Sequence, residues 1–234
     1  TEHGRMTPYA GLVYDIDDHW SAYASYADIF RVQSDLRTAD GGSLPPVVGS
    51  NYEAGVKSEW LDGRLNTSFA LFRITERNRA QSDPNYPEVG DCCYQASGQV
   101  RSQGFEAEVS GRLAPGWEVA GGYTFNTTRY LKDAENGGAP FRTFTPKHIF
   151  QLWTTYQLPS EWNRWSVGGG VNVKSGVYTE SAVQGPVSGS SVRVSQGGYA
   201  IWNARIGYRV SDHVSLGLNV NNLFDKVYCL LYTS

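Results

Sequence analysis

Apolar and polar side chains alternate along most of this chain, and this period of two constrains the fold more than any other feature of the sequence. It recurs in about ten segments, near residues 9–16, 19–30, 51–61, 64–76, 99–113, 117–129, 147–158, 164–177, 198–210 and 213–228. Successive side chains of a β-strand point to opposite faces, whereas a helix repeats about every 3.6 residues. The pattern therefore predicts an all-β protein with about ten antiparallel strands.

Several segments separate an apolar face from a polar face over about nine or more residues, the length that a tilted strand needs to cross a bilayer. Apolar members are Phe105, Ala107 and Val109; Trp117, Val119, Gly121, Tyr123 and Phe125; Trp202, Ala204, Ile206 and Tyr208; Val214, Leu216, Leu218 and Val220. Polar or small residues stand between them. Segments 19–30 and 64–76 alternate less cleanly, so their faces stay open.

Composition narrows the class of protein. The hydrophobic fraction is 40% and the mean hydropathy is −0.41, values that fit both a soluble sandwich and a transmembrane β-barrel. No apolar run approaches the roughly 20 residues of a membrane helix, which excludes a helical membrane protein. A net charge of −3 without a run of Lys or Arg excludes a nucleic-acid partner.

The connections between the predicted strands alternate between short and long, which separates the two remaining classes. Short connections are Asp17-Asp18, Asp62-Gly63, Ala114-Pro115-Gly116, Pro159 to Asn163 and Ser211-Asp212, and long ones are residues 31–50, 77–98, 130–146 and 178–197. Outer-membrane barrels have short periplasmic turns and long extracellular loops. The alternation therefore favours a transmembrane barrel, and it places both ends of this chain on the extracellular side, as in an internal slice of a larger barrel.

Aromatic residues gather near the short connections. Trp20, Trp60, Trp117, Trp165 and Tyr208 lie within about three residues of one, and the last four have the parity of the apolar face. Amphipathic rings are favoured at membrane interfaces, so these residues predict an aromatic girdle.

Six stretches resemble one protein family: TPYAGLVYDI, NYEAGVKSEW, GRLNTSFALFRI, VRSQGFEAEVSGRL, FTPKHIFQLWTTYQL and NVNNLFDKVY. They resemble, in order, the C-terminal half of TonB-dependent ferric-siderophore receptors, especially the branch of coprogen, rhodotorulic acid and pyoverdine receptors. The resemblance covers about residues 7–228. It implies about ten strands of a 22-stranded barrel that encloses a plug, with NNLFDK in the next-to-last strand and the plug, its TonB box and the other strands outside this chain.

The resemblance implies an outer-membrane receptor of a Gram-negative bacterium that binds a ferric siderophore and imports it with energy from the TonB complex, which acts through the plug. The iron travels as a chelate whose ligand sites are filled, so no resident cofactor and no protein ligands to iron are expected. Loop position makes the candidate ligand-binding residues Tyr86, Tyr94, Arg101, Phe141, Phe144, Tyr178 and Arg193. The candidate lumen or plug-facing residues are Glu53, Lys57, Glu59, Glu106, Glu108, Asn203 and Arg205.

Other classes of outer-membrane protein make different demands on the sequence. A passive porin would need neither plug nor TonB box, and an adhesin is a weaker third reading. A ten-stranded outer-membrane protease would have to use Asp17, Asp18, Asp212 and His213, which lie at the periplasmic turns rather than at the loop end, so no catalytic residue is predicted. Cys92 and Cys93 do not match the spacing of a metal site, and a vicinal disulfide or a partner elsewhere remain open.

The chain ends in CLLYTS, which does not resemble the family. One back-translation, TGT CTC TTA TAC ACA TCT, resembles the transposon mosaic end used in sequencing libraries. We therefore expect residues 1–228 to be partial receptor barrel, and residues 229–234 to be a tail from adapter read-through.

Overall fold

The computed structural model describes residues 6–86, 90–134, 136–182 and 191–228. Its strands are β1 (Tyr9–Asp15), β2 (Trp20–Arg31), β3 (Val47–Trp60), β4 (Leu65–Ser82), β5 (Tyr94–Ala114), β6 (Trp117–Lys132), β7 (His148–Gln157), β8 (Trp165–Lys174), β9 (Val177–Ala182), β10 (Ser191–Gln196), β11 (Tyr199–Arg209) and β12 (Ser215–Val220), with one 3-10 turn, η1 (Ser160–Trp162). None of the described segments is a helix long and apolar enough to cross a membrane.

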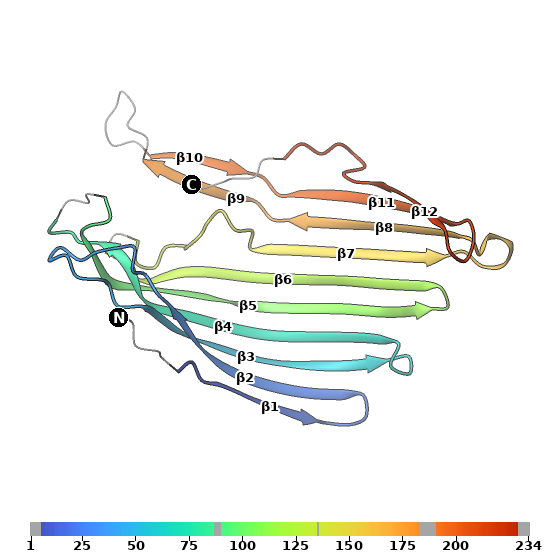
Figure 1. The fold of residues 1–234 in the computed structure, drawn as a ribbon, viewed down its shortest axis with the longest axis horizontal. Helices are drawn as coiled ribbons and strands as arrows, with labels where there is room; N and C mark the ends of the chain where they lie inside the picture. The colour runs from blue at the N-terminus through green and yellow to red at the C-terminus, as the bar shows by residue number, and fades with distance from the viewer. Residues whose placement is uncertain (1–5, 87–89, 135, 183–190, 229–234) are drawn as a thin grey trace. The chain divides into compact units, whose positions relative to one another are not determined.

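Ten strands form one sheet in the order β1-β2-β3-β4-β5-β6-β7-β8-β11-β12, and β9 and β10 form a separate two-stranded sheet. Strands that follow each other in the sequence are therefore neighbours, apart from the inserted β9–β10 hairpin (Figure 1). The pairs β1–β2, β6–β7, β7–β8, β8–β11, β11–β12 and β9–β10 are antiparallel. The prediction of an all-β, antiparallel chain with ten main strands is confirmed.

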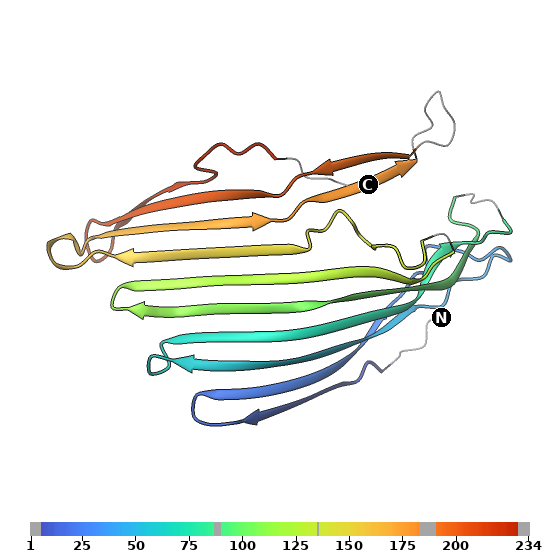
Figure 2. The ribbon, with the colours of Figure 1, turned by 180° about the vertical axis from the view of Figure 1, so that it is seen from behind.

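The chain divides into two compact units, which are described separately. Unit 1 comprises Thr1–Val56, Ala70–Phe105 and Asn126–Arg142, and unit 2 comprises Lys57–Phe69, Glu106–Phe125 and Thr143–Ser234. Unit 2 carries the short turns of β3–β4, β5–β6, β7–β8 and β11–β12, which lie together at one end of its strands (Figures 1 and 2). The β9–β10 hairpin extends from the other end of β8 and β11.

Local chemistry explains the short turns. In unit 1, the Asp17 carboxylate accepts the backbone N–H groups of His19 (2.7 Å) and Trp20 (2.8 Å), which closes the β1–β2 turn. In unit 2, Asp62 and Gly63 have φ of 58° and 76°, the left-handed conformation that Gly and Asp tolerate best in tight hairpins. All five predicted short connections are turns in the structure.

Register in unit 2 confirms the two faces. Tyr156 of β7 lies opposite Trp117 and Val167, and Ile206 of β11 lies opposite Val167 and Leu218. Residues directly opposite each other share a face, so this row spans five strands on the apolar side. Ile206 is 48% exposed and Leu218 is 63% exposed. The apolar face of unit 2 is therefore not covered by the described part of the chain.

The prediction of a tenth strand over residues 213–228 is wrong beyond Val220, where β12 ends. The sequence NNLFDK forms a turn rather than part of a strand. Asn222 and Asp225 have φ of 54° and 48°, a conformation that a strand does not contain. The Asn222 side chain accepts the backbone N–H of Lys226 at 2.9 Å. Asn and Asp offer the backbone such local bonds in place of the strand ladder.

The predicted long connection 178–197 is also wrong in part, because β9 and β10 pair within it, from Val177 opposite Gln196 to Ala182 opposite Ser191. Four strands extend beyond their predicted bounds: β3 begins at Val47, β4 continues to Ser82, β5 begins at Tyr94 and β6 continues to Lys132. Turn-forming residues predicted loops at these positions, but the strands continue into them. The strand predicted over 164–177 is shorter, because β8 ends at Lys174.

Most of the buried apolar side chains belong to the connections and strand ends of unit 1. Leu44, Val47, Cys93 and Val100 are each at most 8% exposed. They come from the connection before β3, from β3 itself, from the residue before β5 and from β5. The long connections of unit 1 and the strands beside them thus contribute a small core of buried apolar side chains.

Candidate functional site

Unit 1 contains a cavity of about 270 Å³ at the ends of β4, β5 and β6. Its lining comprises Arg79, Ala80, Gln81, Ser82, Pro84, Gly98, Val100, Tyr130, Asp133, Ala134, Asn136 and Phe141. Phe141 was predicted as a ligand-binding residue. Neither Arg79 nor Tyr130 was.

Phe141 is surrounded by one aromatic and two cationic side chains. Its ring centroid lies 5.0 Å from that of Tyr130 in an edge-to-face arrangement. The guanidinium carbons of Arg79 and Arg142 lie 4.9 Å and 5.2 Å from the same centroid. Distances below about 6 Å are those of cation–π contacts. Arg79 also forms a 2.6 Å ion pair with Glu76, which fixes the position of its guanidinium.

The lining of the cavity also includes the polar residues Gln81, Asp133 and Asn136. The amide of Gln81 donates to the Asp133 carboxylate at 2.6 Å. The other oxygen of that carboxylate accepts the backbone and side-chain N–H groups of Asn136 at 2.8 Å and 3.0 Å. Asp133 therefore shapes the connection after β6, and the cavity combines cationic and aromatic groups with hydrogen-bonding groups.

Arg79 was not predicted as a site residue, because the sequence pattern placed the end of the fourth strand near residue 76. The alternation of Arg77, Arg79 and Gln81 was a signal that the strand continues. Asn78, however, has φ of 60°, a conformation that interrupts regular strand geometry at that point. Which way Arg79 points could not be read from its spacing alone.

Tyr94 is held by the connection between β2 and β3. The backbone carbonyl of Arg37 accepts the N–H groups of Tyr94 (2.9 Å) and Cys93 (3.3 Å), and the Arg37 N–H donates to Asp91 O at 2.7 Å. Cys92 and Cys93 form a disulfide with each other, which resolves the pairing that the sequence left open. In the same β2–β3 connection, a hydrogen bond from Thr38 lowers the pKa of the Asp40 carboxyl.

Gln33, in the β2–β3 connection, joins that connection to the end of β4. Its side-chain amide donates to Pro45 O and to Asn78 O, both at 2.6 Å, and its oxygen accepts the Ala80 N–H at 3.3 Å. The β2–β3 connection is therefore bound both to the residues before β5 and to the end of β4, next to the cavity.

The other two candidate ligand-binding residues of unit 1, Tyr86 and Arg101, do not line the cavity. Tyr86 is 52% exposed, and its backbone N–H donates to Asp83 O at 3.1 Å. Arg101 lies in β5, and its Nε is buried without a hydrogen-bond partner among the described residues. The structure does not bring either residue into the lining of the cavity around Phe141.

In unit 2 the structure brings two predicted residues together on the β9–β10 hairpin. The guanidinium carbon of Arg193 lies 3.6 Å from the ring centroid of Tyr178, and Arg193 stands opposite Glu180 in the register. The Tyr178 N–H donates to Thr143 O at 3.1 Å, next to the third candidate, Phe144, which is 37% exposed.

The predicted lumen residues are partly held by polar neighbours. Glu53 accepts the Tyr23 hydroxyl at 2.6 Å, and Glu108 accepts the Ser68 hydroxyl at 3.5 Å. Asn203 accepts the Asn222 N–H at 3.1 Å. Asn203 and Arg205 lie on the polar face of β11, opposite Gly170 and Gly168 of β8. That these residues line a lumen or face a plug stays a prediction, and the same holds for Lys57, Glu59 and Glu106.

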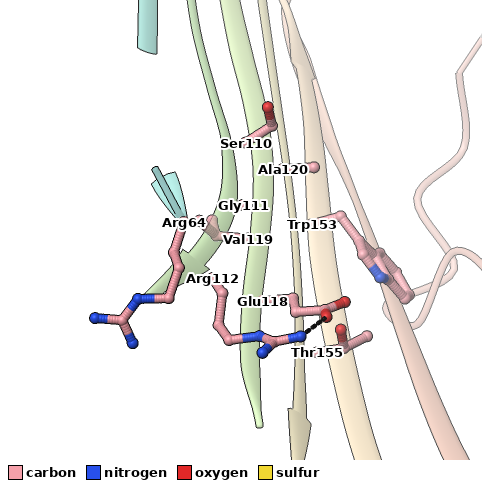
Figure 3. Close-up of a pocket in the computed structure, with 9 residues that line it drawn as sticks. All are labelled: Arg64, Ser110, Gly111, Arg112, Glu118, Val119, Ala120, Trp153 and Thr155. Atoms are coloured by element: carbon pink, nitrogen blue, oxygen red, sulfur yellow. Dashed lines mark ion pairs between the residues drawn. The ribbon is translucent and has the colours of Figure 1, made fainter. Parts of the chain in front are cut away.

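A second cavity, of about 580 Å³, lies on unit 2 near its short turns (Figure 3). Arg64, Arg112, Glu118, Trp153 and Thr155 contribute side chains to it. Arg112 and Glu118 form a 3.7 Å ion pair between half-exposed side chains, which contributes little stability. In Figure 3, Arg64 points away from that pair.

No group of three or more His, Cys, Asp or Glu side chains in the described part of the chain is arranged to hold a metal ion. Two of the candidates for a protease take part in turns: the Asp17 carboxylate accepts the backbone N–H groups of His19 and Trp20, and the backbone N–H of His213 donates to the Ser211 hydroxyl.

Comparison with known proteins gives consistent matches. The family model described as TonB dependent receptor-like, beta-barrel, matches residues 1–223. A ferric-pyoverdine receptor of a Pseudomonas strain is 44% identical over 97% of this chain and 27% of the relative. The ferripyoverdine receptor of Pseudomonas aeruginosa is 40% identical over 97% of this chain and 28% of the relative. This chain therefore spans about a quarter of the length of these relatives.

Solved structures agree. The crystal structure of the outer-membrane ferripyoverdine receptor of Pseudomonas aeruginosa, bound to ferripyoverdine, superposes with a TM-score of 0.86 at 39% identity, covering 97% of this chain and 30% of that one. The alcaligin outer-membrane receptor of Bordetella pertussis gives a TM-score of 0.70 at 38% identity, covering 93% and 34%.

Proposed function

Because this chain belongs to the TonB-dependent receptor family, we propose that it is part of an outer-membrane receptor that binds a ferric siderophore and imports it. Relatives named as ferric-pyoverdine receptors support the siderophore class. Their family consists of receptors rather than enzymes, and the relatives lie in the outer membrane. The proposed partners are the ferric siderophore, outer-membrane lipid and the TonB complex, which would act through parts of the protein beyond this chain.

The observation that carries the proposal is the arrangement around Phe141. A ferric siderophore presents planar groups and oxygen atoms while its own donors fill the coordination sphere of the iron. Aromatic rings pack against planar groups, and guanidinium groups form charge-assisted bonds to oxygens. Arg79, Tyr130 and Phe141 offer these interactions at one cavity. No protein ligand to iron is needed for this mode of binding.

The other predicted ligand-binding residues remain part of the proposal, and they differ in how far their contacts support it. Tyr178 and Arg193 form a second aromatic–cation pair in unit 2 and are proposed as a separate contact. Tyr94 is held in place by the Arg37 carbonyl. Among the described residues, Tyr86 and Phe144 have no contact that favours a ligand over a role in their own loops, and Arg101 lies in β5 outside the cavity lining.

The test uses the intact receptor that contains this chain. We expect Phe141→Ala to weaken binding of radiolabelled ferric pyoverdine by about tenfold or more, equivalent to about 1.4 kcal/mol, because both guanidinium groups lose the ring beneath them. Tyr14→Ala is the matched control, since Tyr14 is an aromatic of the same unit that is 67% exposed and lies outside the cavity. Unchanged affinity in Phe141→Ala and Arg79→Ala together would remove this cavity from the proposal.

Uptake distinguishes a receptor from a passive porin. We expect import of the bound chelate by cells to stop when TonB is deleted, because the proposed transport uses its energy. Import that continues without TonB and rises linearly with solute concentration would favour the porin.

A further inference from the structure

Arg79 and Glu76 point to the same side of β4, although they stand three positions apart. Side chains of a regular strand alternate between two faces, so residues three positions apart lie on opposite faces. The Arg79 guanidinium nevertheless contacts the Glu76 carboxylate at 2.6 Å. Leu71, Arg73 and Arg77, which alternate along β4, are exposed, whereas the Arg79 side chain is only 23% exposed. The strand therefore changes face between Glu76 and Arg79.

The neighbouring strand β5 shows which face Arg79 reaches. A Cβ built at Gly98 would lie 3.1 Å from Arg79 Cβ and 3.1 Å from Gln81 Cγ. Gly98 thus faces both side chains, and its lack of a side chain leaves room for them. All three residues line the cavity that contains Phe141. The change of face therefore places Arg79 in the candidate site.

Asn78 is the residue at which the change of face occurs. Its φ of 60° lies in the left-handed region, which regular strands do not use. A residue in this conformation acts as an extra residue in the strand, so that the side chains after it exchange faces. Among residues with a side chain, Asn is one of those that tolerate this conformation best. With an extended backbone at Asn78, Arg79 would share the exposed face of Arg77.

Gln33 of the β2–β3 connection holds the backbone on both sides of this interruption. Its side-chain N–H group donates to Asn78 O at 2.6 Å, and its side-chain oxygen accepts the Ala80 N–H at 3.3 Å. The same amide donates to Pro45 O at 2.6 Å, and the Asn78 amide donates to Pro46 O at 3.4 Å. One side chain therefore supplies the donor and the acceptor that a partner strand supplies in a regular ladder.

We propose that Asn78 and Gln33 are positioning residues that set the affinity of the receptor for a ferric siderophore by holding Arg79 beside Phe141. The inference rests on the proposed function, because Arg79 and Phe141 belong to the cavity proposed to bind the chelate. Neither Asn78 nor Gln33 is among the residues that line this cavity. Each acts through Arg79, whose guanidinium carbon lies 4.9 Å from the Phe141 ring centroid, and not through contact with the ligand.

The test uses the intact receptor that contains this chain. The double variant Gln33→Met with Asn78→Val keeps similar side-chain volumes but removes the hydrogen bonds of Gln33 and introduces a branched residue that disfavours positive φ. Asn78→Gly is the conservative variant, since glycine adopts positive φ readily. Thr75→Val is the matched control, because it introduces the same Val in β4 at a residue that lies outside the cavity and does not have positive φ.

We expect the double variant to bind ferric pyoverdine about tenfold or more weakly than the parent protein and about as weakly as Arg79→Ala, the loss that follows removal of a bond to a charged group. Asn78→Gly and Thr75→Val should bind within about twofold of the parent protein, because both keep the face of Arg79. Rescue by Asn78→Gly separates the role of the backbone conformation from that of the Asn78 side chain.

The Arg79→Ala background distinguishes positioning from a general structural role. In a receptor that already carries Arg79→Ala, the double variant should change the affinity by less than about twofold, since no guanidinium remains to be positioned. A further loss of about tenfold in that background would overturn the proposal, because Asn78 and Gln33 would then act on more than Arg79.

A crystal structure of the double variant gives a second readout, which needs no ligand. We expect the Arg79 guanidinium to lie beyond the roughly 6 Å from the Phe141 ring centroid that defines a cation–π contact. A guanidinium that stays over the ring would overturn the proposal, whatever the affinity. A heat-modifiability assay identifies a misfolded double variant, and Gln33→Met alone then carries the same expectations.

The single variants separate failure of this inference from failure of the proposed function. Affinity like that of the parent protein in Arg79→Ala, together with weak binding by Phe141→Ala, would overturn the positioning role and leave the proposed function intact. Absence of ferric pyoverdine binding and of binding to other ferric siderophores by the parent protein would overturn the proposed function and this inference with it.

Discussion

Single residues decide where the regular strands of this protein are interrupted. Gly111 of β5 has φ of 136°, and a Cβ at that position would lie 2.1 Å from the backbone oxygen of Arg64. The Arg112 N–H donates to the same oxygen at 2.7 Å. Glycine is required here because its backbone alone can adopt this φ and approach the neighbouring strand so closely. The interruption positions Arg64 and Arg112 at the second cavity (Figure 3).

We expect Gly111→Ala to lower the free energy of unfolding of the intact receptor by about 1–3 kcal/mol, the cost of a strained backbone conformation, with a further loss from the steric clash. Thermal unfolding in detergent measures this change. Gly122→Ala serves as the control, because a Cβ there would make ordinary contacts at 3.6 Å and 3.7 Å. Equal unfolding temperatures for the two variants would show that the strand accommodates a side chain at Gly111.

Elements of unit 1 are held together by their connections. The small core of Leu44, Val47, Cys93 and Val100 is assembled from two long connections and the strands beside them. The disulfide of Cys92 and Cys93 lies where the Arg37 carbonyl accepts two backbone N–H groups. A disulfide between adjacent residues closes the smallest possible loop, so the chain-entropy account gives it little effect on global stability. Its effect is expected to be local.

We expect the double variant Cys92→Ser with Cys93→Ser to leave the unfolding temperature of the intact receptor within about 2 °C, because little loop entropy is involved. Hydrogen exchange at the N–H groups of residue 93 and Tyr94 should become about tenfold faster, since both bonds to Arg37 O depend on the geometry of the turn. Exchange at Ser102 in the middle of β5 is the internal reference. Unchanged exchange at residues 93 and 94 would show that the loop core, rather than the disulfide, holds this turn.

At the scale of the whole molecule, the order of the strands leaves β1 and β12 at the two ends of the sheet. All seven residues of β1 and all six residues of β12 are exposed. Unpaired strand edges and uncovered apolar faces are sites of aggregation. This chain spans about a quarter of the length of the ferric-pyoverdine receptors to which it is similar.

We therefore expect this chain, expressed alone, to aggregate and to bind no siderophore, whereas the intact receptor is soluble in detergent. Size-exclusion chromatography in detergent and a heat-modifiability assay test this expectation. A monodisperse, heat-modifiable species formed by this chain alone would contradict it. The intact receptor, refolded by the same procedure, controls for the conditions.

Much of the fold was predictable because it depends on local sequence. Alternation identified the ten main strands, and Asp, Gly and Pro at the short connections identified the turns, since both signals act between residues close in the chain. The same local signals failed at Asn221 to Tyr228 and within 178–197, where side-chain bonds or strand pairing decided the conformation. The tail 229–234 lies outside the described residues, so its origin stays a prediction.

The candidate site was predictable only in part. Phe141, Tyr178 and Arg193 could be chosen by their loop positions, but Arg79 and Tyr130 could not be assigned to the same cavity as Phe141. The sequence by itself determined the class of fold, the two faces of the strands and the family. Tertiary structure decided which side chains of separate strands became neighbours. The positive-φ interruptions at Asn78 and Gly111 and the register between strands depend on contacts between distant parts of the chain, which the local sequence does not specify.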